Sequence, residues 1–130
     1  MARAVLVGVL SFLLLGLGGS PAGAGNPDFG RTWARDKVLR AGCHDYRYQY
    51  KVKSPESDWA LETFLIDPNK KEVGAGQMLY NSDPARGSST FRVCRRTTVP
   101  GRFKIKGKLT YAGGDEERWI KPGYFRMRRP

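Results

Sequence analysis

The chain has 130 residues, 40% of them hydrophobic and 27% charged, and 23 basic residues against 12 acidic ones give a net charge of +11. This length holds one small domain, which excludes a multidomain enzyme, a repeat array and a polytopic membrane protein. The hydrophobic share is too high for an intrinsically disordered chain in spite of the charge.

Residues 1–24 predict a cleaved signal peptide. Arg3 supplies a positive start, an apolar run covers 4–17, and Ala22-Gly23-Ala24 fits the small-residue pattern of a cleavage site. The run is shorter than the roughly 20 residues that span a bilayer, although an uncleaved N-terminal anchor is the alternative. The mature chain is therefore predicted to be secreted or extracytoplasmic, with a net charge of +10, since Arg3 is the only charged residue of the leader.

The mature chain is predicted to consist of a flexible N-terminal lead-in over residues 25–36 and a β-sandwich domain over residues 37–130. The lead-in has no hydrophobic period and is rich in turn-forming residues, with Phe29 or Trp33 as docking side chains. After it, apolar and polar residues alternate with a period of two, which is typical of half-buried strands. Turn signals separate the predicted strands, which lie near 38–39 and at 46–53, 59–66, 72–80, 91–96, 101–111 and 118–129.

This spacing predicts an all-β fold, a single antiparallel β-sandwich of about seven strands. The glycines within 72–80 indicate an edge strand or a bulge. The side chains of Tyr46, Tyr48 and Tyr50 form a one-sided ladder, interpreted as core rather than as a stacking platform for sugars or bases, because the opposite face is polar.

The Pro-Gly-Arg-Phe entry at 100–103 and the alternating run that follows it resemble the E–F corner and F strand of immunoglobulin-like and fibronectin-type-III-like sandwiches. The resemblance covers about residues 37–129. It implies a fold class and no activity, because this architecture carries many unrelated functions.

One disulfide is predicted between Cys43 and Cys94, because an exported chain folds in an oxidising compartment. Antibody-type domains join their B and F strands through the core, whereas Cys94 precedes the strand that resembles F. By parity Cys43 shares a face with Arg47, and Cys94 shares one with Arg92. The bridge is therefore predicted to be a peripheral staple within one sheet or at its end.

Candidate catalytic and metal-binding residues are scarce, so the chain is predicted to be no enzyme and to use no cofactor or metal. The single histidine, His44, lacks a set of partners for acid–base or metal chemistry. Three acidic residues at 115–117 lack the alternating spacing of calcium loops and are interpreted as solvated loop residues.

A basic face is the feature that folding alone does not require. Four cations alternate along 101–111, and Arg126 and Arg128 lie beside them if the last strand pairs with this one, with Glu62 as the candidate to relieve their repulsion. Two interpretations are open: a solvated face that keeps the protein soluble, or a surface for an anionic polymer or membrane headgroups. The predicted anion-binding residues are Arg102, Lys104, Lys106, Lys108, Arg126 and Arg128.

The resulting functional prediction is a non-catalytic, monomeric, secreted binding module that docks an anionic polymer and reads no nucleic-acid sequence. One alternative is an accessory subunit that docks a protein partner through an apolar patch at Phe64 and Ile66. The other is a small protease inhibitor that presents Arg86 on the loop at 81–89.

Overall fold

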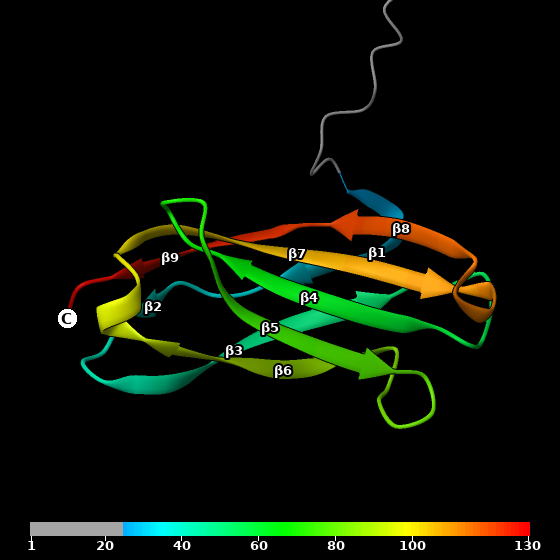
Figure 1. The fold of residues 1–130 in the computed structure, drawn as a ribbon, viewed down its shortest axis with the longest axis horizontal. Coiled ribbons are helices and arrows are strands. Elements are labelled where there is room, and N and C mark those ends of the chain that lie inside the picture. Colours follow the sequence, from blue (N-terminus) through cyan, green and yellow to red (C-terminus); the bar gives the residue numbers. More distant parts are fainter. Residues whose placement is uncertain (1–24) are drawn as a thin grey trace, which may run out of the picture.

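The computed structural model describes residues 25–130, and the predicted signal peptide lies outside the described residues. These residues form nine strands and two short 3₁₀ helices, arranged as a two-layered β-sandwich (Figure 1). The elements are β1 (Asn26–Trp33), β2 (Lys37–Val38), β3 (Cys43–Val52), β4 (Ala60–Ile66), β5 (Glu72–Leu79), β6 (Arg86–Cys94), η1 (Arg95–Thr97), β7 (Gly101–Tyr111), η2 (Ala112–Gly114), β8 (Glu116–Lys121) and β9 (Gly123–Arg128).

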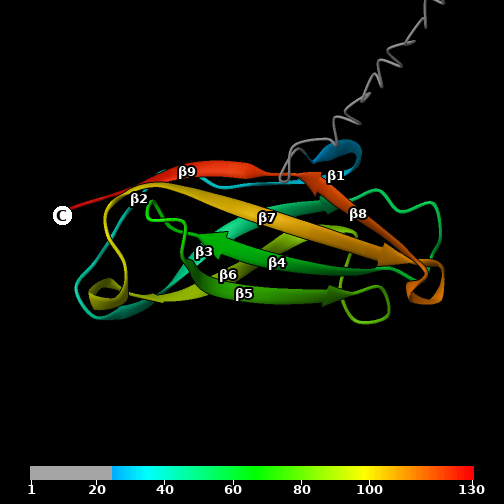
Figure 2. The same ribbon diagram turned by 45° about the horizontal axis from the view of Figure 1, so that its top comes forward.

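The first layer is built around β7. β4 pairs with one edge of β7, while β9 and then β8 pair with the other edge, and β5 extends the layer beyond β4. The second layer is the antiparallel set β1, β3 and β6, which lies behind the first (Figures 1 and 2). A parallel pairing of β1 with β8 joins the two layers, and β2 pairs in parallel with β9 at the far edge.

The predicted all-β sandwich is confirmed, with two corrections of detail: there are nine strands, and the β1–β8 and β2–β9 pairs are parallel. The expected edge strand is also confirmed, since β5 pairs only with β4 and its register shifts near Leu65.

The predicted flexible lead-in at 25–36 is wrong, because most of it is strand β1. Its inward positions are Gly30 and Thr32, neither of which is strongly apolar, so the strand gives no alternating hydrophobic signal. The Thr32 hydroxyl donates to the carbonyl of Ile105 at 3.1 Å and accepts from the N–H of Gly123 at 2.9 Å. Polar bonds across the layers therefore fix a strand that hydrophobic periodicity does not reveal.

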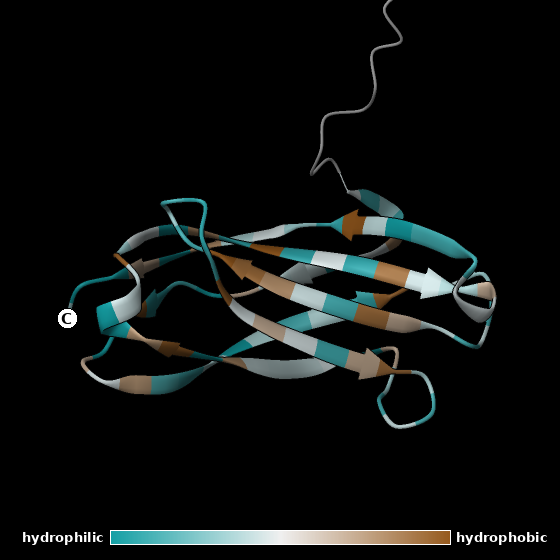
Figure 3. Ribbon diagram, in the orientation of Figure 1, coloured by the Kyte–Doolittle hydropathy of each residue, from teal (hydrophilic) through white to brown (hydrophobic). Residues whose placement is uncertain are grey.

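The core lies between the layers and consists of side chains from alternate residues of each strand. In Figure 3 this alternation is visible as bands of hydrophobic and hydrophilic residues along β4 and β7. The tyrosine ladder is buried as predicted: Tyr48 stacks on Phe91 at 4.2 Å, and its hydroxyl hydrogen-bonds to that of Thr63 at 2.8 Å. The largest fully buried side chains are Tyr48, Tyr50, Phe91, Phe103, Leu39, Leu61, Leu65, Ile105, Leu109, Ile120, Met127 and Val93.

The disulfide joins Cys43 to Cys94, which are directly opposed residues on the neighbouring strands β3 and β6. Cys43 is exposed and Cys94 is half-buried, so the bridge lies at the surface of one sheet. The predicted peripheral staple is confirmed.

We expect a Cys43→Ser/Cys94→Ser variant to remain folded but to lose about 2–4 kcal/mol of unfolding free energy. The bridge links residues 51 positions apart, and a loop of that length gives roughly 4 kcal/mol of chain-entropy stabilisation at most. Urea unfolding at neutral pH measures the loss. A variant that fails to fold would show instead that the staple is required for the sandwich to form.

Candidate functional site

The outward face of the first layer interleaves cations with apolar side chains. Lys106 lies opposite Phe64 on β4, and Lys104 lies between Ile66 on β4 and Tyr124 on β9. The exposed aromatic residues Trp119 and Tyr124 belong to the same layer. The predicted basic face is therefore a mixed cationic and aromatic surface.

Three of the six predicted anion-binding residues line one cleft, whereas the other three, Lys108, Arg126 and Arg128, lie outside it. Lys108 has acidic neighbours, with its ammonium 3.7 Å from Glu62 and 4.0 Å from Glu117, and only 26% of its side chain is exposed. The expected relief by Glu62 is thus confirmed. Arg126 lies directly opposite Arg102, whereas Arg128 pairs with β2 beyond the start of β7.

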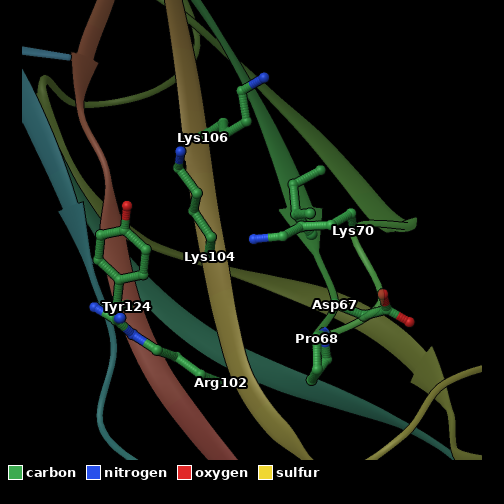
Figure 4. A pocket seen from close by; sticks show the side chains of 8 residues that line it. Asp67, Pro68, Lys70, Arg102, Lys104, Lys106 and Tyr124 are labelled. Carbon is green, nitrogen blue, oxygen red and sulfur yellow. The ribbon is translucent and has the colours of Figure 1, made fainter. Parts of the chain in front are cut away.

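The remaining three cations line one cleft of about 540 Å³ on this face (Figure 4). Arg102, Lys104 and Lys106 come from β7, Tyr124 comes from β9, and Lys70 enters from the turn between β4 and β5. In Figure 4 the ammonium of Lys70 points toward β7 beside Lys104. Lys70 was missed by sequence reasoning, because the turn at 67–70 signals only the end of a strand.

Asp67 builds the turn that carries Lys70. Its buried Oδ1 accepts the backbone N–H groups of Asn69 and Lys71, both at 2.9 Å, and its Oδ2 accepts the hydroxyl of Thr98 at 2.9 Å. Figure 4 shows this carboxylate pointing away from the cleft. Asp67 is the only acidic residue of the lining, and its oxygens are already used to hold the turn.

Three of the four cleft cations lie close to aromatic rings. The guanidinium of Arg102 lies 4.1 Å from the ring centroid of Tyr124, and the ammonium of Lys104 lies 5.8 Å from it. The ammonium of Lys106 lies 4.6 Å from the ring of Trp119. Within residues 25–130 the ion pairs involve none of the four cations that line the cleft. The cleft therefore gathers positive charge that no carboxylate neutralises.

The remaining sequence candidates take structural positions. His44 donates to the carbonyl of Ala41 at 2.7 Å. Two of the three acids near 115–117 lie beside bases, Glu117 near Lys108 and Glu116 at 2.9 Å from Arg118. In the described part of the chain no three potential metal ligands of the His, Cys, Asp or Glu type lie together.

The inhibitor alternative is wrong in its geometry, because Arg86 is not on a loop. It begins β6 opposite Lys51, and its guanidinium lies 5.7 Å from the ring of Trp33. The apolar pair Phe64 and Ile66 faces outward as expected, but each lies opposite a lysine of β7.

Comparisons with known proteins give little beyond the fold. No protein-family model matches the chain, and no curated protein matches it. One similar solved structure is an AA10 lytic polysaccharide monooxygenase from Streptomyces lividans, with 12% identity and a TM-score of 0.46 over 73% of this chain. The match covers 60% of that protein, so the chain spans less than two thirds of its length.

This neighbour is an enzyme, a finding that contradicts the predicted non-catalytic binding module. We therefore propose no non-catalytic module that docks an anionic polymer on the face of β7 and β9, and a likeness of this size assigns no activity to the chain. As for membranes, none of the helices within 25–130 has the length and apolar character needed to cross a bilayer.

We expect Asp67→Ala to destabilise the protein by about 1–3 kcal/mol, because two backbone N–H groups and the Thr98 hydroxyl lose their acceptor. Thermal and urea unfolding measure this loss. Asp115→Ala is the control, since the structure shows no side-chain bond of Asp115 within the described residues. Equal stability of the two variants would contradict the role of Asp67.

Proposed function

We propose that the protein binds a small ligand that carries phosphate or sulfate groups, in the cleft formed by β7, β9 and the β4–β5 turn. The observation that supports this is the convergence of Lys70, Arg102 and Lys104 on one cleft whose only acid is committed to the turn. The proposed residues are Arg102, Lys104 and Lys106, which are three of the six predicted from the sequence, together with Lys70 and Tyr124.

The electrostatic repulsion between the cations of the cleft supports a binding role. Like charges on neighbouring strands repel, and Arg102 faces Arg126 directly across β7 and β9. An oxyanion would reverse that cost by accepting hydrogen bonds from several cations at once. Hydrogen bonds to charged groups contribute roughly 1.5–3 kcal/mol each.

The arginine and the lysines of the cleft would bind the ligand in different ways because their charged groups differ in geometry. The guanidinium of Arg102 is planar and suits two parallel hydrogen bonds to one oxyanion, and stacking on Tyr124 restricts its orientation before the ligand arrives. The ammonium groups of Lys70 and Lys104 act as adaptable point charges on either side. A volume of about 540 Å³ is within the usual range for small-molecule sites, so the ligand would extend beyond a single inorganic ion.

The setting proposed for this activity is outside the cytoplasm, on an immunoglobulin-like sandwich. The signal-like pattern of residues 1–24 and the Cys43–Cys94 disulfide support export. The cleft is open to solvent, so its affinity for anions would fall as the salt concentration rises.

Inorganic pyrophosphate is a suitable first probe, measured by isothermal titration calorimetry at low salt. We expect Lys104→Gln to weaken binding about tenfold or more, because one charge-assisted hydrogen bond is lost. Lys108→Gln is the matched control: it removes the same charge from the same face of β7, but its ammonium lies beside Glu62 and Glu117 outside the cleft. We expect its affinity to stay within about twofold of the starting protein.

Equal losses in the two variants would show that net charge alone attracts the anion and would contradict a site in the cleft. Failure of the unsubstituted protein to bind pyrophosphate, sulfate or a phosphorylated sugar at low salt would contradict the proposal as a whole. Thermal unfolding of each variant confirms that the fold is retained.

A further inference from the structure

A second group of cations lies on the opposite side of the molecule, on the outward face of β1, β3 and β6. Register places Arg31, Lys51 and Arg86 in one row, because Arg31 opposes Lys51 and Lys51 opposes Arg86. The next outward row holds Trp33, Gln49 and Ser88. Adjacent strands are about 4.8 Å apart, so the row of three cations spans about 10 Å.

Next to these rows lies a hollow of about 460 Å³ whose charged lining is entirely basic. Its cations are Arg35 from the segment after β1, Lys37 from β2, Arg47 from β3 and Arg86 from β6. Trp33 and Gln49 also line it. Sequence analysis assigned three of these cations, Arg35, Lys37 and Arg47, to no site, and it placed Arg86 on an inhibitor loop.

The nearby carboxylates are engaged elsewhere. Asp45 lies 3.6 Å from Arg92, and Asp36 accepts the backbone N–H of Arg126 at 2.8 Å. Over 25–130, the ion pairs and side-chain hydrogen bonds include none of the four cations that line the hollow. The positive charge of this face is therefore uncompensated, as it is in the cleft.

Lys37 shows the electrostatic cost of this arrangement. Burial lowers the pKa of its ammonium, and repulsion by Arg35 and Arg47 lowers it further. Both effects disfavour the charged form in the free protein. An anion held between these side chains would offset the repulsion and move the pKa back toward its ordinary value.

The chemistry of the lining indicates which polyanion fits. Three of the four cations are arginines, whose planar forks match carboxylate, sulfate and phosphate oxygens. The ring of Trp33 already carries the guanidiniums of Arg31 at 4.5 Å and Arg86 at 5.7 Å, so a nucleic-acid base would have to displace them to stack there. Amide and hydroxyl groups, from Gln49 and Ser88, fill the rest of the outward row and suit sugar hydroxyls.

We infer that the outward face of β1, β3 and β6 binds an acidic polysaccharide, through Arg35, Lys37, Arg47 and Arg86. The ligand lies across the strands, with its acidic groups on the arginines and its hydroxyls over Gln49 and Ser88. Most of this surface belongs to the second layer, although Lys37 lies on β2, which pairs with β9. It shares no lining residue with the cleft of the first layer. Its test is therefore independent of the proposed ligand of the cleft.

Heparin is the probe, with binding measured as a function of salt concentration by the full mature chain. Each cation that contacts a linear polyanion releases counterions, so removing two contacts lowers the slope of log K against log salt by about two. We expect this loss for Arg47→Gln/Arg86→Gln. Should that variant unfold, Arg35→Gln/Arg47→Gln tests the same hollow, since it leaves the start of β6 unchanged.

The matched control is Arg95→Gln/Arg96→Gln, which removes the same charge from two exposed arginines of η1 at the disulfide end. Retained heparin binding in this control, with loss in the hollow variant, supports the surface. Equal loss in the control overturns it, because net charge would then explain the retention. Tighter binding of a single-stranded thymidine 20-mer that depends on Trp33 would also overturn it, in favour of a nucleic-acid surface.

Discussion

The register of β7 is the constraint on which the rest of the structure depends. Phe103, Ile105 and Leu109 are completely buried, and a slip of one residue in either direction would put two lysines and a further polar residue in their places. Because β7 has partners along both edges, the same register also aligns β4, β8 and β9. Burial of three apolar side chains thus forces four cations onto the opposite face, whatever those cations do.

In the part of the chain that the structure describes, many acidic side chains accept hydrogen bonds from the backbone and form no ion pairs, and this decides which cations lack a neighbouring negative charge. Several aspartates bind backbone N–H groups at turns and strand ends: Asp58 accepts from Gly113, Asp83 from Leu79, and Asp67 from two residues of its own turn. These carboxylates stabilise loops instead of neutralising bases. On β7, acidic side chains reach only Lys108, so the two ends of one face differ in electrostatic character.

Sequence reasoning succeeded where side-chain period alone decides the structure. It predicted the sandwich, the outward cysteines and Glu62 as the acid beside the basic face, because each follows from alternation along a strand. It failed at β1, where inward glycine and threonine replace apolar residues and hydrogen bonds across the layers hold the strand. It also missed Lys70 and the face around Trp33, because both sites join segments that only the pairing of distant strands brings together.

The position of the two cationic sites on opposite layers has a consequence for how they act. A small ligand in the cleft cannot touch the face around Arg47 and Arg86, since the hydrophobic core lies between the layers. The two sites share no lining residue, so we expect variants at one site to leave binding at the other unchanged. Exposed charges separated by more than about 8–10 Å are largely screened at physiological salt, so the cations that line a site contribute most to the binding of its own ligand. Each site must therefore bind through its own side chains, and the net charge of the chain cannot substitute for their arrangement.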